Sequence, residues 1–160
     1  MRIHLVAIGR RMPPWISDGF SEYAQRLRSG VRLELVEVDT PRRGQNPDLS
    51  RIVREEGARL LQAAPSGAYR IALDQSGRSY DSESLAEQLE QWMTFGRDVA
   101  LIVGGPDGLS DEVLTSVDQR WSLSPLTLAH PLVRIVIAEQ LYRAYAISRG
   151  MPYHRSGRVS

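Results

Sequence analysis

The stretch VALIVGGPDGLSDEVLTSVDQRWSLSPLTLAHPL, residues 99–132, holds two apolar segments that each end abruptly in a loop of small residues. The first segment runs into Gly104, Gly105 and Gly108, and glycine lets a backbone adopt positive φ and approach other groups closely. The second runs into the loop 122–128, where serine and threonine alternate with leucine around a proline. Ordinary β-to-α turns would account for either loop alone. The pair favours one site for a flat, partly polar ligand gripped by main-chain groups.

Outward from this stretch, short apolar segments alternate with helical patterns along the whole chain. We expect strands at 3–8, 31–38, 69–74, 99–103 and around Trp121. We expect helices after Pro13-Pro14, from a cap at Asp48 or Ser50 to about Ala63, over about 82–95, after Ser110, and from Pro131 to about Ser148, with a turn at 75–78. This alternation predicts a parallel α/β sheet covered on both faces. Ligands of such sheets bind at the carboxyl ends of the strands, where Asp74, Gly104 and Ser124 would lie.

Length and composition narrow the class of protein. A chain of 160 residues suits a single domain, which we expect to span 1–160. No apolar run approaches the roughly 20 residues of a membrane helix, and the run 5–8 is too short for a secretory signal. The chain has no cysteine, which excludes disulfides and thiolate chemistry and is compatible with a reducing compartment. We therefore expect a cytoplasmic protein with no membrane partner.

The positive charge is carried entirely by arginine, since none of the 20 basic side chains is lysine. This excludes a Schiff-base lysine and a P-loop lysine. A net charge of +1 argues against a protein coated in basic surface. Local clusters occur at Arg10-Arg11, at Arg42-Arg43 with Arg51 and Arg54, and at His154-Arg155 with Arg158. They suit either solvated faces or a side that faces RNA.

Several common sites are not supported by the motifs. The run 104–109, GGPDGL, does not fit the dinucleotide-binding fingerprint, and neither a P-loop nor a nucleophile elbow is present. His4, His130 and His154 lack the spacing of zinc ligands, so we expect no metal. What remains is a ligand held by loops and backbone, with arginine and tyrosine as the reactive polar groups.

The last predicted helix, 131–148, is apolar around almost its whole circumference. Such a helix must be buried on nearly every side, and a domain of this size rarely achieves that alone. We therefore expect a second subunit to cover it, which predicts a homodimer. Glu139 and Arg143 are spaced i,i+4 on this helix, which suits a structural ion pair as well as a catalytic one.

A set of strings along the chain resembles the ribosomal RNA large-subunit methyltransferase H family, of the SPOUT superfamily. The strings are LVAIG at 5–9, LD at 73–74, GGPDGL at 104–109, WSLS at 121–124, LTL at 126–128, HPLVR at 130–134, EQLYRA at 139–144 and PYHR at 152–155. The resemblance covers essentially the whole chain. It implies a parallel-sheet α/β fold with a C-terminal trefoil knot, a rare exception to the rule that chains do not thread loops. It also implies transfer of a methyl group from S-adenosylmethionine to N3 of a pseudouridine in 23S ribosomal RNA, as free RNA or in the assembled ribosome.

By position, the resemblance also implies site residues. The cofactor residues would be Leu73, Gly104, Gly105, Leu123, Ser124, Pro125, Leu126, Thr127 and Leu128. Pro125 departs from the small residue expected there and removes one backbone donor. RNA binding and catalysis would fall to Arg143, Tyr153, His154 and Arg155, followed by residues 156–160, which run beyond the expected end of the family. An arginine would favour the anion of the target nitrogen and a histidine or tyrosine could relay its proton, but no general base is assigned.

Two other functions stay open at this point. One is a catalytically inactive RNA-binding or ribosome-assembly factor with the same fold, which affinity for S-adenosylmethionine and methylation of ribosomes would separate from an enzyme. The other is a small-molecule methyltransferase, which would not depend on RNA for activity.

Overall fold

The computed structural model describes residues 1–155, and the side chains of His154 and Arg155 lie outside the described part. Within it the strands are β1 (Arg2–Ile8), β2 (Arg32–Val38), β3 (Tyr69–Ser79), β4 (Val99–Val103) and β5 (Gln119–Ser122). The α-helices are α1 (Pro14–Ala24), α2 (Leu49–Ala63), α3 (Ser82–Thr94), α4 (Asp111–Ser116) and α5 (His130–Ser148), followed by a 3-10 turn, η1 (Pro152–Arg155). No helix of residues 1–155 is long and apolar enough to cross a membrane.

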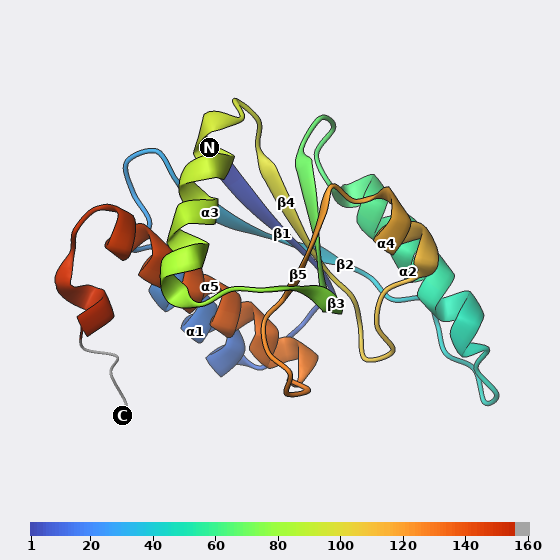
Figure 1. Cartoon of the computed structure of the whole chain (residues 1–160). Helices are drawn as coiled ribbons and strands as arrows, with labels where there is room; N and C mark the ends of the chain where they lie inside the picture. Colours follow the sequence, from blue (N-terminus) through green and yellow to red (C-terminus); the bar gives the residue numbers. More distant parts are fainter. Residues whose placement is uncertain (156–160) are drawn as a thin grey trace.

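The strands form one sheet in the order β2-β1-β4-β3-β5, and every neighbouring pair is parallel (Figure 1). All five residues of β4 are buried, as are residues 3–8 of β1. Strands buried on both faces read as continuous apolar runs, which is why the segments 3–8 and 99–103 were recognisable in the sequence. The predicted α/β class with a parallel sheet is confirmed, whereas the trefoil knot stays a prediction.

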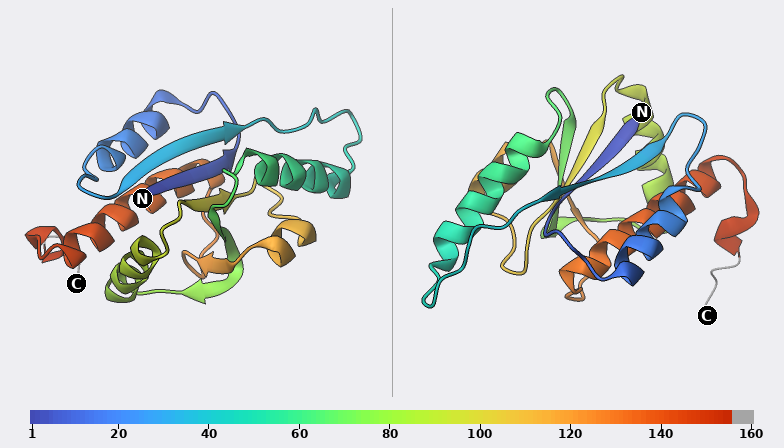
Figure 2. Two further views of the ribbon diagram at one scale, coloured as in Figure 1. Left: turned by 90° about the horizontal axis from the view of Figure 1, so that it is seen from above. Right: turned by 180° about the vertical axis from the view of Figure 1, so that it is seen from behind.

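Helices cover both faces of the sheet, as predicted. On one face α1, α3 and α5 pack over a core that includes Ile3, Leu5 and Trp92, and on the other α2 and α4 cover Val6 and Ile8 (Figure 2). Successive side chains of β1 therefore alternate between the two cores, as the period of a strand requires. The carboxyl ends of the strands are left for the connecting loops.

Three helices begin with a side-chain cap. The Asp48 carboxylate accepts from the Arg51 amide at 3.2 Å, so Asp48, of the two expected candidates, caps α2. Asp81 accepts from the Ser84 amide at 2.7 Å, and Ser110 from the Val113 amide at 3.3 Å. Each of these contacts satisfies one of the amides that a helix start leaves unpaired.

The prediction that the strand ends at 74, before a turn at 75–78, is wrong, because β3 continues to Ser79. Leu73 and Arg78 both stand in register with Trp121, so the residues between them form a bulge within the strand. The Asp74 carboxylate accepts from the Ser76 amide at 2.9 Å, which closes the bulge locally. Gly77 is required there, since a Cβ would lie 2.6 Å from the Trp121 backbone nitrogen. The turn-forming residues were read correctly, but here they bend a strand that then resumes its pairing.

The helix α5 lies between α1 and α3 on one face of the sheet (Figure 2). Its buried side chains include Ile137, Leu141 and Tyr145, and the exposed large apolar side chain on it is Leu132, at 37%. The chain's own helices therefore provide most of the cover that we expected from a second subunit. The apolar composition of α5 no longer requires a partner, and the homodimer stays a prediction.

Candidate cofactor site

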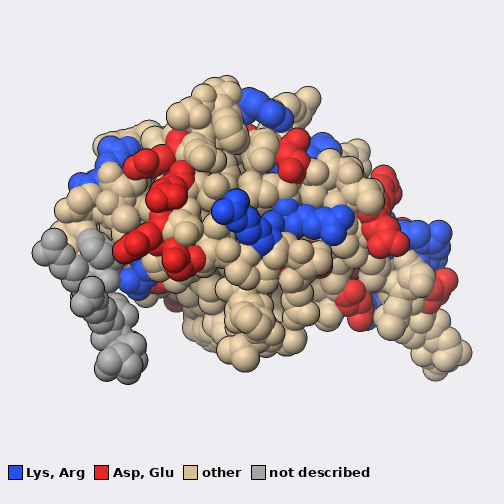
Figure 3. Space-filling model, viewed as in Figure 1, with Lys and Arg blue, Asp and Glu red and all other residues tan. Residues whose placement is uncertain are grey.

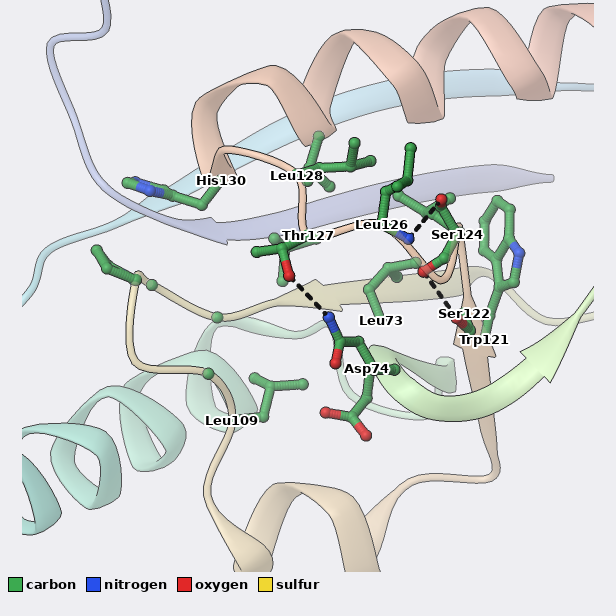
Figure 4. Close-up of a pocket in the computed structure, with 18 residues that line it drawn as sticks. Leu73, Asp74, Leu109, Trp121, Ser122, Ser124, Leu126, Thr127, Leu128 and His130 are labelled. Carbon is green, nitrogen blue, oxygen red and sulfur yellow. Dashed lines mark hydrogen bonds between the residues drawn. The ribbon is translucent and has the colours of Figure 1, made fainter.

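A cavity of about 310 Å³ lies where β3, β4 and β5 end (Figure 4). Its lining comprises Leu73, Asp74, Gln75, Val103, Gly104, Gly105, Pro106, Gly108, Leu109, Trp121, Ser122, Leu123, Ser124, Leu126, Thr127, Leu128, His130 and Val133. Asp74, Gly104 and Ser124 meet at this edge, as expected for the carboxyl ends of parallel strands. The loops 104–108 and 122–128, predicted to form one site, thus face one cavity, and its size suits a small ligand.

The first loop, 104–108, is a tight turn that closes on itself. The Gly108 amide donates to the Gly105 carbonyl at 3.1 Å, and Gly108 has φ of 84°. A Cβ on Gly104 would lie 2.7 Å from the Gly108 carbonyl oxygen, and one on Gly105 would lie 3.0 Å from Glu56 Oε2. Gly104 and Gly105 therefore allow close packing within the protein.

The second loop, 122–128, is held by side chains that bond to its own backbone and to β3. Ser124 Oγ accepts from the Leu126 amide at 2.9 Å, and Thr127 Oγ1 accepts from Gln75 Nε2 at 3.4 Å. Pro125 sits between these anchors, is exposed, and does not line the cavity, unlike the other eight predicted cofactor residues. The loop presents backbone groups and leucine side chains to the cavity, which suits an adenine ring bound by hydrogen bonds at its edge and apolar contact on its faces.

Further residues of the cavity were missed as site residues in the sequence. Trp121 and Leu109 add apolar walls, and Gln75 and His130 add polar groups (Figure 4). The signal for His130 was its position, directly after the second loop and at the first turn of α5. Within the described residues, no group of three His, Asp or Glu side chains could hold a metal ion.

Arg143 and Tyr153 form a separate cluster at the other end of α5. The Arg143 guanidinium pairs with Glu139 and lies 4.9 Å from the centre of the Tyr153 ring. The Tyr153 hydroxyl donates to Glu139 Oε1 at 3.1 Å, and its ring packs edge-on against Tyr142. Burial, followed by the negative charge of Glu139, raises the pKa of Tyr153 to about 12. This phenol is therefore protonated at neutral pH.

The cluster is remote from the cavity within one chain. Arg143 follows His130 by 13 positions on α5 (143 − 130), which is ~20 Å along a helix axis. Neither Arg143 nor Tyr153 lines the cavity, and η1 lies beyond the C-terminal end of α5, at the left of Figure 1, whereas α5 begins beside the cavity. The backbone of His154 and Arg155 belongs to η1, but their side chains, like residues 156–160 with Arg158, fall outside the described part.

The basic clusters are partly neutralised by acidic neighbours. Arg10 pairs with Asp39 at 2.7 Å, Arg43 with Asp107 at 2.7 Å, and Arg51 with Glu55 at 2.8 Å. The face shown in Figure 3 carries acidic and basic side chains side by side, with a short basic row across its middle. This mixture fits the low net charge, and charge alone does not identify an RNA interface on the face that Figure 3 shows.

Comparison with known proteins gives a consistent result. A family model described as "Predicted SPOUT methyltransferase" matches residues 1–154. The chain is 52% identical over 155 residues to "Ribosomal RNA large subunit methyltransferase H" of Thioalkalivibrio sulfidiphilus, covering 97% of this chain and 99% of that protein. It is 54% identical over 157 residues to the protein of the same name from Acidithiobacillus ferrooxidans, covering 98% and 99%. A solved structure of a probable methyltransferase from Bordetella pertussis Tohama I shares the fold, with a TM-score of 0.56, 16% identity, and coverage of 89% of this chain and 93% of that one.

Proposed function

The chain belongs to the SPOUT methyltransferase family, whose members bind S-adenosylmethionine, and on that premise we propose that it methylates large-subunit ribosomal RNA. The proposal rests on the match to relatives of that name over nearly the full length of both chains. The resemblance in sequence extends it to N3 of a pseudouridine in 23S ribosomal RNA. We further propose that residues 1–160 form a single domain and that the protein acts in the cytoplasm, where ribosomes are found.

The residues of the cavity fit this cofactor. Backbone groups of the loops 104–108 and 122–128 face an apolar wall of Leu73, Leu109 and Trp121, as an adenosine group needs. The Asp74 carboxylate lines the same cavity and suits the positive charge of the sulfonium. When bound, S-adenosylmethionine supplies an electrophilic methyl group. The protein holds the target nitrogen in line with this methyl group. Complete alignment lowers the activation barrier by roughly 7 to 11 kcal/mol.

A homodimer would bring the cluster of Arg143 and Tyr153 of one chain to the cavity of the other. Arg143 follows Val133, the last residue of α5 that lines the cavity, by ten positions (143 − 133), which is ~15 Å along the helix axis. If Arg143 and Tyr153 serve catalysis, this separation prevents them from reaching the cavity within one rigid chain. A second copy that brings its C-terminal end to the cavity of the first would complete each active site. We therefore propose that the segment starting at Tyr153, with His154 and Arg155, acts across a dimer interface.

The single observation that carries the enzymatic function is the match to methyltransferases over nearly the whole length of both chains. It favours the enzyme over the inactive RNA-binding or ribosome-assembly factor. A small-molecule methyltransferase is disfavoured by the names of the full-length relatives.

The test uses ribosomes and free 23S ribosomal RNA from cells that lack this protein. Purified protein and radiolabelled S-adenosylmethionine should transfer the label to one nucleotide, identified by mass mapping as a pseudouridine methylated at N3. Label in ribosomes, free RNA or both decides the form of the substrate. Cofactor binding without any transfer to either would support the inactive factor, and transfer without RNA would support the small-molecule enzyme.

A further inference from the structure

His130 stands at the edge of the cavity with both ring nitrogens available. It is half-buried, lines the cavity, and begins α5 directly after the second loop. Among the described residues no hydrogen bond engages its ring, in contrast with His4, whose Nε2 lies 3.2 Å from Asp98 Oδ2. A Cβ added at Gly9 would lie 3.9 Å from His130 Nε2, which places the ring beside the loop that follows β1. In Figure 4 the ring projects away from the leucines of the second loop.

The frame around His130 is built from buried, charged groups. Arg134, 1% exposed, donates to Glu37 Oε2 at 2.7 Å and to the Gly9 carbonyl at 2.7 Å, so it ties the first turn of α5 to β1 and β2. Glu56 of α2, also 1% exposed, accepts from Thr40 Oγ1 at 2.7 Å and packs under Gly105. Glu56 Oε1 is buried without a hydrogen-bond partner among residues 1–155. These ties hold the base of α5 in place relative to both loops of the cavity.

The same surroundings favour a neutral imidazole. Burial lowers the pKa of His130, and the positive charge of Arg134 lowers it further, while Glu56 acts in the opposite direction. Arg134 lies on the same helix, Glu56 lies on α2 on the other face of the sheet, and Gly9, beside the ring in the loop after β1, carries no charge. A neutral imidazole has a free electron pair on one nitrogen and can accept a proton at neutral pH.

The other polar groups expected near the chemistry are engaged by neighbours or hold their protons. Asp74 Oδ2 accepts from the amide and hydroxyl of Ser76, and the Asp74 carboxylate is the group proposed to face the sulfonium. The Tyr153 phenol keeps its proton below a pKa of about 12, and Arg143 is a cation paired with Glu139. Of the residues at the cavity whose side chains are described, His130 is the one imidazole, and no hydrogen bond occupies its ring.

We propose that His130 accepts the proton from the ring N–H of the target nucleobase. This inference rests on the proposed function. The N–H bond breaks, the proton moves to the imidazole nitrogen, and the nitrogen's electron pair forms the new bond to the methyl carbon. The electrons of the methyl–sulfur bond stay on sulfur, and the imidazolium then releases its proton to water.

The experiment compares wild type with His130→Gln and with His4→Gln as a matched control. At saturating S-adenosylmethionine, we expect His130→Gln to lower kcat for ribosomal RNA methylation by about 10²- to 10⁴-fold, the usual contribution of a general base. In wild type, kcat should rise with pH as His130 loses its proton, and His130→Gln should lack this rise. Added imidazole should restore part of the kcat of the variant. His4→Gln should keep the kcat of wild type, and calorimetry should give both variants a cofactor Kd within a few-fold of wild type.

A second measurement needs no RNA. The imidazole NMR signal of His130, identified by its loss in His130→Gln, should move when S-adenosylhomocysteine is added, while the signal of His4 stays in place. The inference is overturned by a His130→Gln variant with the kcat of wild type, by a loss of cofactor affinity that matches the loss of rate, or by a low rate that imidazole does not restore. Wild-type protein that methylates no ribosomal RNA would overturn the proposed function together with this inference. An active wild type with an equally active variant overturns this inference alone.

Discussion

The two regions predicted to carry function are built in opposite ways. The cavity at the ends of β3, β4 and β5 is lined by two loops and by apolar side chains such as Trp121 and Leu109. Close packing at the glycines holds the first loop, and hydrogen bonds accepted by Ser124 and Thr127 hold the second. The cluster of Glu139, Arg143 and Tyr153 is formed by side chains on the far end of α5 and lines no part of that cavity. The difference shows that a single chain forms the whole cavity proposed for the cofactor, whereas its C-terminal polar side chains lie outside that cavity.

The largest effect on the cofactor cavity is expected for Gly104→Val. The new side chain would place Cβ 2.7 Å from the Gly108 carbonyl, so the turn 104–108 must open. We expect cofactor binding to fall below detection in calorimetry and the free energy of unfolding to drop by about 1–3 kcal/mol, as for overpacking. Gly44→Ala is the control, since nothing lies within 4 Å of a Cβ there. Binding of normal strength in Gly104→Val would show that the loop is not part of the site.

The relation between the regions is tested by deleting residues 153–160. Methylation should be lost while cofactor affinity changes only a few-fold, because the deleted segment lies outside both loops of the cavity. In mixed dimers of this deletion with Gly104→Val, a segment acting across the interface puts both defects in one site and leaves the other intact, which predicts about half of the wild-type activity. A segment acting within its own chain predicts none, and a monomer in sedimentation at micromolar concentration would exclude the arrangement altogether.

The second region should carry a pH signature in the alkaline range. The pKa of Tyr153 is raised to about 12, above the ordinary value of about 10 for tyrosine, so the folded protein holds this proton more tightly than the unfolded chain. The resulting stabilisation is fully present below pH 10 and is lost as pH rises toward 12. Urea unfolding across that range should show the decline in wild type and a smaller decline in Tyr153→Phe. Equal slopes in the two proteins would contradict the assignment to Tyr153.

The smallest effect is expected for Pro125→Ala. The sequence suggested that Pro125 costs the site a backbone donor, but the residue is exposed and does not line the cavity. Cofactor affinity measured by calorimetry should therefore stay close to that of wild type. A marked gain in affinity would mean that the missing amide does face the cofactor.

Local sequence patterns determined much of the fold. The apolar run 99–103 became a strand buried along its whole length, and Asp48 was one of two candidates for the cap that it provides. Such features follow from a few neighbouring residues, because burial on both faces demands continuous apolar runs and helix starts demand side-chain acceptors. The same locality let the two loops be assigned to one edge of the sheet before the sheet was known.

Tertiary structure alone decided what those residues contact. The bulge at 74–77 arises because Trp121, far along the chain, pairs with both Leu73 and Arg78. Gly104 is needed because a side chain there would collide with the Gly108 carbonyl, and α5 is covered by α1 and α3 of the same chain. The separation of Arg143 from the cavity, and the place of His130 beside it, depend on where α5 begins relative to the sheet. Composition shows how apolar a helix is, but only packing shows what covers it and which polar group is left free to react.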